Sequence, residues 1–177
     1  LNNVTIQGLY SPSINYVYCG VLCGFERNIN ISNCNITNCK IDIAYSSGDT
    51  NLTGIICIGG LFGRAYADIN NKGTITKCNV INTSIKIILN SNLLTCYVGG
   101  LFVNDTSDSK KSQLINSSFI GNITIDNKDG INTNPCWISG LCIGSTDINS
   151  CYTINSIKII NGINATITGI SESPSAG

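Results

Sequence analysis

Cysteine is the residue type that offers the widest choice of chemistry in this sequence. The 177 residues include ten cysteines and no histidine. The spacing of Cys19, Cys23, Cys34 and Cys39 could imitate a four-cysteine zinc site. Six further cysteines are spread along the chain, which is more typical of disulfides formed in an oxidising compartment. The disulfide candidates are Cys19, Cys23, Cys34, Cys39, Cys57, Cys78, Cys96, Cys136, Cys142 and Cys151.

The acidic residues do not form a catalytic pattern. The close pairs Asp105/Asp108 and Asp126/Asp129 lie in turn-forming stretches, where aspartate commonly caps the backbone. A polysaccharide lyase or hydrolase needs clustered acids and usually a base. The stretch from Asp126 to Gly130 lacks the ligand spacing of a calcium loop. We therefore predict that the chain is not an enzyme and that it binds no metal and no cofactor.

Aromatic residues and glycine pairs suggest two further kinds of site. Trp137 and the seven tyrosines could form a platform for sugar rings, although aromatic residues scattered along a repeat protein are more often packing or incidental surface. The pair Gly59-Gly60 precedes apolar residues instead of Lys-Ser/Thr, so it does not predict a phosphate-binding loop.

Asparagine followed two residues later by serine or threonine marks an acceptor site for N-linked glycans. The sequons begin at Asn3, Asn30, Asn35, Asn51, Asn82, Asn104, Asn116, Asn122 and Asn164. Their number is about twice what chance gives in so Asn-rich a chain, which favours passage through a eukaryotic-type secretory pathway. We expect glycans foremost at Asn51, Asn104 and Asn164, which lie in looser stretches.

These candidate residues recur on a repeated frame. Leucine returns about every 40 residues, at Leu22, Leu61, Leu101 and Leu141, and a period of this size is typical of solenoids. Each leucine block precedes a second block in which Ile is followed three residues later by Cys or Ser. These second blocks start at Ile31, Ile75, Ile115 and Ile148. The spacer between the two blocks is polar and varies in length, as expected of a surface loop.

The composition favours strands and turns. Ile and Thr are common and favour strands, Asn and Gly favour turns, and no 3.6-residue apolar period is present. We predict an all-β fold, a parallel β-helix (β-solenoid) of about four disulfide-stapled coils of about 40 residues; two coils of about 20 residues per repeat is the alternative. The chain 1–177 would be one domain, with a partial first coil at 1–18, repeats at 19–56, 57–95, 96–135 and 136–170, and a flexible tail at 171–177.

Two disulfide schemes fit this frame. Pairing within repeats would join Cys19–Cys34, Cys23–Cys39, Cys57–Cys78 and Cys136–Cys151, and would leave Cys96 and Cys142. Pairing between repeats would join Cys19–Cys57, Cys23–Cys39, Cys34–Cys78, Cys96–Cys136 and Cys142–Cys151. The third block has Ser118 where the others have cysteine, so Cys96 lacks a partner within its repeat. We favour the second scheme, because stacked coils bring like positions within disulfide reach.

Asparagine also recurs at one position of the frame. We expect Asn3, Asn38, Asn82, Asn122 and Asn155 to form a ladder at a turn, because Asn tolerates the left-handed conformation and its amides can bond from coil to coil. Asn82 and Asn122 also begin sequons, and an inward, stacked asparagine cannot carry a glycan. Glycans on these two residues would place the ladder outside the coil.

The blocks resemble two known repeat families. Gly59–Gly63, followed by a spacer and Gly73–Val80, resembles the GLUG repeat of bacterial and protist surface proteins. Phe119–Asn122 is similar to the Phe-x-x-Asn repeat of chlamydial polymorphic outer-membrane proteins. The first and fourth repeats depart from both patterns, with Cys23 and Cys142 where phenylalanine is expected. The resemblance implies parallel β-solenoids displayed at cell surfaces for adhesion or structure, and it implies no catalytic residue.

Charge and hydropathy exclude two classes of partner. Charged residues make up 11% of the chain and the net charge is zero, whereas nucleic-acid binding requires a basic patch. Apolar runs such as Gly54–Leu61 are too short to span a membrane. The sequence shows no signal peptide and no initiator methionine, so we expect a mature product or an excised segment. Nucleic acid and membrane insertion are therefore not expected.

We expect an extracellular, glycosylated structural protein whose main partner is another copy of itself. A solenoid without charged or helical caps would stack head to tail into a surface fibre or coat. The alternatives are an adhesin that binds glycans or proteins through the variable loops and, third, a polysaccharide-active enzyme. The edge residues expected in the assembly are Asn3, Val4, Thr5, Ile6, Ile163, Ile167 and Ile170.

Overall fold

A computed structural model describes residues 1–10, 16–27, 30–46, 53–66, 73–90, 93–104, 112–128, 132–144, 146–168 and 171–172. These residues form an all-β protein without an α-helix, and every pairing between their strands is parallel. The all-β prediction and the prediction of parallel strands are therefore confirmed.

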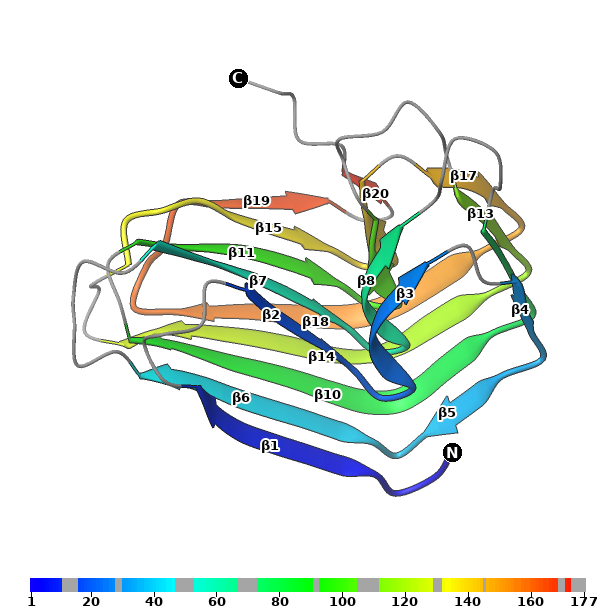
Figure 1. Ribbon diagram of the computed structural model, residues 1–177, viewed down its shortest axis with the longest axis horizontal. Helices are drawn as coiled ribbons and strands as arrows, with labels where there is room; N and C mark the ends of the chain where they lie inside the picture. Colours follow the sequence, from blue (N-terminus) through cyan, green and yellow to red (C-terminus); the bar gives the residue numbers. More distant parts are fainter. Residues whose placement is uncertain are drawn as a thin grey trace.

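Two large sheets face each other (Figure 1). Sheet A contains, in spatial order, β1 (Thr5–Tyr10), β6 (Lys40–Ser46), β10 (Asn79–Asn90), β14 (Ser118–Asn127) and β18 (Tyr152–Ile160), with β5 (Asn35–Thr37) also on β10. Sheet B contains β2 (Tyr16–Gly20), β7 (Thr53–Gly59), β11 (Leu93–Gly99), β15 (Cys136–Ser139) and β19 (Ala165–Thr168). In both sheets the spatial order follows the order along the chain.

Shorter strands connect the two layers and continue the same order. One small sheet pairs β3 (Cys23–Arg27) with β8 (Phe62–Tyr66), and another contains β12 (Phe102–Val103), β16 (Cys142–Ile143) and β20 (Ser171–Glu172). A third contains β4 (Asn30–Ser32), β9 (Thr74–Thr76), β13 (Ser112–Ile115) and β17 (Thr146–Asn149). The chain thus visits the sheets in one order, and each visit adds a strand beside its predecessor.

The core lies between sheets A and B and is built from columns of apolar side chains. Alternate residues of a strand point to one face, so the register places Ile41, Ile85, Ile123 and Ile157 in one inward column of sheet A. The first three are almost fully buried, whereas Ile157, on the last strand of the sheet, is only partly buried. The sequence pattern of alternating isoleucines is therefore the pattern of the core.

Glycine pairs allow close approach where sheet B ends. A Cβ atom on Gly60 would lie 2.5 Å from the carbonyl oxygen of Gly100, and a Cβ on Gly100 would collide with the carbonyl of Gly140 and the ring of Phe119. Side chains larger than hydrogen therefore do not fit here. The Gly59-Gly60 motif therefore allows close packing between repeats.

Two columns of left-handed residues make corners in the chain. The first column contains Asn33, Lys77, Asn116 and Ser150, with φ between 48° and 57°. The second contains Asn3, Asn38 and Asn82, and the side-chain amide of Asn82 donates to the Asn38 oxygen at 2.6 Å. Three members of the predicted asparagine ladder therefore stack as expected.

The prediction was wrong for Asn122 and Asn155. The pairing of β10 with β14 shifts register between Ile81 and Thr83, so that Thr83 pairs with Gly121 and Asn82 has no counterpart in β14. Asn122 pairs with Ser156, and Asn155 pairs with Gly121. The third repeat is one residue shorter at this corner, which sequence spacing does not reveal.

The third repeat is also displaced by one residue in its second block. Ile75 pairs with Leu114 and not with Ile115, because Leu114 is the residue that points into the core. Three residues further on, Ser117 therefore takes the position of Cys78, and its hydroxyl accepts a hydrogen bond from the Cys78 backbone N–H at 3.0 Å. The prediction that Ser118 replaces the cysteine was wrong by one position.

Candidate functional site

The cysteines are thiols in the structure, and the register separates the predicted disulfides into two groups. Cys96 and Cys136 are direct partners on β11 and β15. Cys34 and Cys78 precede the paired residues Asn35 and Asn79, so they also stack. Parallel neighbours of this kind lie within the Cα separation that a disulfide tolerates. These two pairs of the between-repeat scheme are geometrically compatible with the fold.

The predicted pair Cys19–Cys57 does not fit the register. Cys57 pairs with Tyr18 and Cys19 pairs with Ile58, so the two thiols point to opposite faces of sheet B. Cys19 belongs to the core between the sheets, whereas Cys57 packs under aromatic residues on the outer face. The mismatch of one residue arises because the first repeat has two residues between its cysteine and Leu22, and the second has three before Leu61.

Four of the thiols are not poised as nucleophiles. Burial raises the pKa of Cys19 to about 11, and it also raises the pKa of Cys78 and Cys151. The pKa of Cys96 lies well above its usual value, because of a hydrogen bond with Cys136 and then burial. Thiolate is the reactive form, so these groups are unreactive at neutral pH. The described residues contain no cluster of His, Cys, Asp or Glu that could hold a metal ion.

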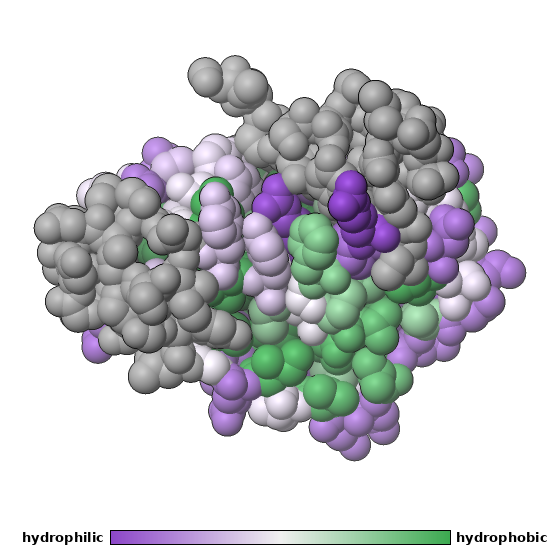
Figure 2. Space-filling view, viewed as in Figure 1, coloured by the Kyte–Doolittle hydropathy of each residue, from purple (hydrophilic) through white to green (hydrophobic). Residues whose placement is uncertain are grey.

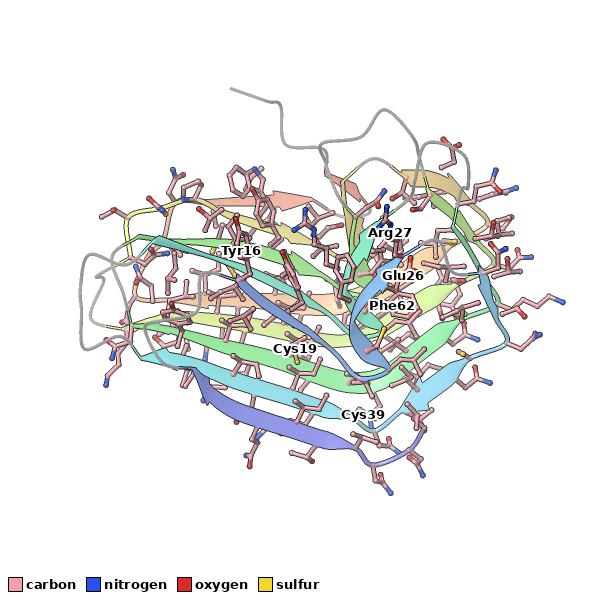
Figure 3. All side chains as sticks on the ribbon, viewed as in Figure 1. Tyr16, Cys19, Glu26, Arg27, Cys39 and Phe62 are labelled. Carbon is pink, nitrogen blue, oxygen red and sulfur yellow. The ribbon has the colours of Figure 1, made fainter. Side chains whose placement is uncertain are left out.

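Two predicted cysteine pairs and the close acidic pairs remain to be placed. Cys23–Cys39 and Cys142–Cys151 stay predictions. Figure 3 labels Cys19, which lies on β2, and Cys39, which lies between β5 and β6. Asp126 accepts a hydrogen bond from the Asn161 amide at 3.0 Å, which is a structural role at a corner. The other predicted acids, Asp105, Asp108 and Asp129, lie outside the described residues.

An aromatic face covers the outer side of sheet B. It consists of Tyr16, Tyr18, Phe25, Arg64, Tyr97 and Trp137. The rings of Tyr97 and Trp137 are stacked, with centroids 4.8 Å apart and an interplanar angle of 7°. The guanidinium carbon of Arg64 lies 5.3 Å from the centroid of Tyr18, and Arg64 donates a hydrogen bond to the Tyr18 hydroxyl. Arginine on an aromatic ring is a favourable cation–π geometry.

Register explains how residues far apart in the sequence form this face. Tyr18, Cys57, Tyr97 and Trp137 occupy one outward column on successive strands of sheet B. Arg64 comes from β8, which leaves the layer of sheet B at a steep angle (Figure 1). Figure 2 shows apolar side chains gathered at the centre of the face that carries β2 and β3. Figure 3 labels Tyr16 on β2, and Glu26 and Arg27 on β3, along this face.

A groove crosses the outer side of sheet A at the corner where the register shifts. This isoleucine groove has a volume of about 390 Å³ and is lined by Ile81, Asn82, Ile120, Gly121, Asn122, Ile154, Asn155 and Ser156. Ile81, Ile120 and Ile154 are in register on β10, β14 and β18. Sequence reasoning missed the groove, although consecutive apolar residues such as Val80-Ile81 indicate that one of them faces outward.

The nine sequons differ in the exposure of their asparagines. Exposed asparagines begin seven of them, at Asn3, Asn30, Asn35, Asn82, Asn116, Asn122 and Asn164. Asn51 lies outside the described residues. Asn104 is 1% exposed, because its backbone pairs with Ile143 and its side chain accepts from Ser112. A buried side chain has no room for a glycan, so the expectation for Asn104 does not fit this fold.

The described members of the predicted assembly set lie at the two ends of the sheets. Among the described strands, β1 and β18 each pair on one side only in sheet A. Val4 and Ile6 at one end, and Ile163 at the other, are apolar residues that the core buries only in part. Ile167 is 51% exposed on β19, and Ile170 lies outside the described residues.

Comparisons with protein-family models, with curated proteins and with solved structures find no match to this chain. The resemblance to the GLUG and chlamydial repeats therefore stays an expectation. Among the described residues, none of the secondary structure is a helix long and apolar enough to cross a membrane.

Proposed function

We propose that the parallel sheets are the faces of one β-solenoid of about four coils, and that the protein is a structural subunit whose copies stack end to end. The observation that carries the proposal is the pair of open sheet edges at β1 and β18, each with half-buried isoleucines beside it. An open strand presents unpaired N–H and C=O groups that another strand can complete. A head-to-tail contact of this kind does not close and gives filaments.

The columns of sheet A support a specific register for the stack. The column of Ile157 begins with Ile6 on β1, and the column of Ile159 begins with Gly8. If β18 of one copy pairs with β1 of the next in the same register, Ile157 lies opposite Ile6. Ile159 lies opposite Gly8, which leaves room for its side chain. The stack would therefore bury isoleucines that each copy leaves partly exposed, which is favourable.

Outward-facing residues are compatible with this register. Lys158 would lie opposite Gln7 and Ser156 opposite Thr5, so no like charges meet across the interface. Polar pairs on the outer side and apolar pairs on the inner side match the pattern within the sheet itself.

The proposed setting is extracellular, at a cell surface, as a secreted glycoprotein. Ten cysteines, two pairs of which stack at positions compatible with disulfides, and seven exposed sequon asparagines support this setting. A fibre or coat formed by a stacked solenoid would gain durability from disulfides between its strands.

Sedimentation velocity over a range of protein concentrations tests the stacking. We expect the protein to form species larger than a monomer, and the variant Ile157→Lys to stay monomeric because it places a charge in the inner column. Ile154→Lys is the matched control, since Ile154 lies on the same strand but faces outward. A wild-type protein that stays monomeric at high concentration would contradict the proposal.

A second variant is designed to block stacking without unfolding the monomer. The Lys40 N–H donates to the Val4 carbonyl at 2.9 Å, and the parallel pattern therefore leaves the Thr5 N–H on the open side of β1. Thr5→Pro removes that donor without breaking the pairing of β1 with β6. We expect it to block stacking while the circular dichroism spectrum and melting temperature of the monomer stay close to wild type.

The aromatic face favours a second candidate function, the binding of glycans as an adhesin. Aromatic rings with polar edges are suited to sugar rings. If this function holds, Trp137→Ala abolishes glycan-array signal, whereas Tyr152→Ala, which removes an exposed ring on sheet A, leaves it unchanged. An array without signal for the wild-type protein would remove the candidate.

A further inference from the structure

The isoleucine groove is an apolar surface with a polar border. Ile154 is 63% exposed and Ile81 is 36% exposed, and Ile120 lies between them on β14. The polar part of its lining comes from residues such as Asn122 and Ser156. The volume of about 390 Å³ falls in the range of small-molecule sites, about 300–1,000 Å³.

Asn122 stands at the edge of this groove in an arrangement that suits a glycan acceptor. It begins the sequon Asn122-Ile123-Thr124, in which the asparagine and the threonine point to the same outer face of β14. Its neighbours on β10 and β18 are Ser84 and Ser156, both small. No side-chain hydrogen bond joins Asn122 to the described residues, so its amide nitrogen is available.

Other sequon asparagines lack this combination. The Asn82 amide donates to Asn38 at 2.6 Å, so a glycan there would break the ladder. The Asn35 oxygen accepts from the Asn79 amide at 3.1 Å, and the Asn30 oxygen accepts from the Thr74 N–H at 3.0 Å. None of the three has both an unengaged side-chain amide and an apolar groove beside it.

We propose that Asn122 carries an N-linked glycan whose first sugar, an N-acetylhexosamine, lies in the isoleucine groove. The acetamide methyl and the ring of the sugar would cover Ile120 and Ile154, and its hydroxyls would lie beside the exposed Ser156 at the polar border of the groove. The proposal rests on the secretory setting proposed above. It accounts for the exposed Ile154 beside a sequon, which glycan coverage would shield from water.

The modification is a transfer from a lipid-linked oligosaccharide. The Asn122 Nδ2 atom attacks C1 of the first sugar, the N–C1 bond forms, and the bond between C1 and the pyrophosphate oxygen breaks. The lipid pyrophosphate leaves with the bonding electrons, and the amide loses one proton to a base of the transferase. Nothing is oxidised or reduced.

Glycopeptide mapping of the full chain, secreted from a eukaryotic host, tests occupancy. We expect a glycan on Asn122 and none on Asn104. Thr124→Ala removes the acceptor motif without changing Asn122, and Thr124→Ser retains the motif and the glycan. A secreted, folded chain with bare Asn122 would overturn the proposal and leave the stacking proposal intact, because stacking is measured on protein made in bacteria.

Melting temperature tests the position of the sugar. After an endoglycosidase trims each glycan to a single sugar, we expect the protein to melt about 2 °C above the Thr124→Ala variant, an increment that covering apolar surface can supply. The same pair made in bacteria gives the effect of the substitution alone, which is subtracted. Thr166→Ala, which removes the exposed Asn164 sequon, is the control and should show no such difference. An occupied Asn122 with no difference in melting temperature would overturn the groove placement.

Discussion

Asn132 is predicted to be one of the most sensitive positions in the chain. It lies between β14 and β15 and is almost fully buried. Its side chain pairs with the backbone of Leu94 as a neighbouring strand would. Its side-chain oxygen accepts from the Leu94 N–H at 3.0 Å, and its amide donates to the Leu94 carbonyl at 2.9 Å. The Asn132 N–H in turn donates to the Asn127 side chain at 2.8 Å.

The substitution Asn132→Ala leaves the N–H and the carbonyl of Leu94 buried without these partners. Each unsatisfied buried group costs about 1–3 kcal/mol, so the expected loss in the free energy of unfolding is roughly 4 kcal/mol. At about 2–4 °C per kcal/mol for a chain of this size, the melting temperature should fall by about 10 °C. Asn132→Asp should also destabilise, because it keeps the shape but places a second acceptor against the Leu94 carbonyl.

Thermal unfolding followed by circular dichroism measures the effect on protein made in bacteria. Asn122→Ala is the matched control, since Asn122 is exposed and its side chain makes no hydrogen bond to the described residues. We expect the control to melt close to wild type. If Asn132→Ala also melts within about 2 °C of wild type, the two hydrogen bonds between the Asn132 side chain and Leu94 do not contribute the stability assigned to them.

The remaining predictions concern packing, pH and disulfides. Gly100→Ala should lower the free energy of unfolding by about 3 kcal/mol or more, since its Cβ meets the backbone of Gly140 in the next repeat. Denaturant unfolding measures this loss, and a value below about 1 kcal/mol would contradict the packing. The pKa of Cys19 is raised to about 11, so its thiol favours folding at neutral pH and this contribution is lost as pH rises from about 9 to 11. The free energy of unfolding should therefore fall between about pH 9 and 11, and it should fall less steeply in Cys19→Ala. Equal slopes in the two proteins would refute the raised pKa of Cys19. Mass-spectrometric mapping of oxidised protein should find Cys96–Cys136 and not Cys19–Cys57.

The sequence was a good guide to fold class, because its signals are local and repeated. Alternating isoleucines such as Ile85 and Ile87 predict strands with one buried face, and both are buried in the core. Asparagines at corners predict left-handed turns, and Asn38 and Asn82 adopt them. Local conformation decides both features, so they can be predicted from residue type and spacing.

Register between repeats could not be predicted in the same way. A shift of one residue moves a side chain to the other face of a strand, and three errors share this cause. Ser117 replaced Ser118 in the cysteine column, Asn122 left the asparagine ladder, and Cys57 faced away from Cys19. Each depends on how one strand pairs with another about 40 residues away.

The candidate surfaces were harder still to predict, because they combine residues from several strands. Arg64 lies on β8 and Tyr18 on β2, and the two side chains contact each other although they are far apart in the sequence. Asn104 precedes a polar stretch that is typical of a loop, yet pairing with Ile143 buries it. Exposure of an asparagine is a tertiary property, so sequons alone did not separate Asn104 from Asn122.

Negative-stain electron microscopy of the concentrated protein tests end-to-end stacking most directly. The proposed pairing of β18 with β1 predicts unbranched threads one molecule wide, and Thr5→Pro should reduce them to single particles. A field of separate, monomer-sized particles for the wild-type chain at high concentration would contradict the proposal that this protein is a stacking structural subunit.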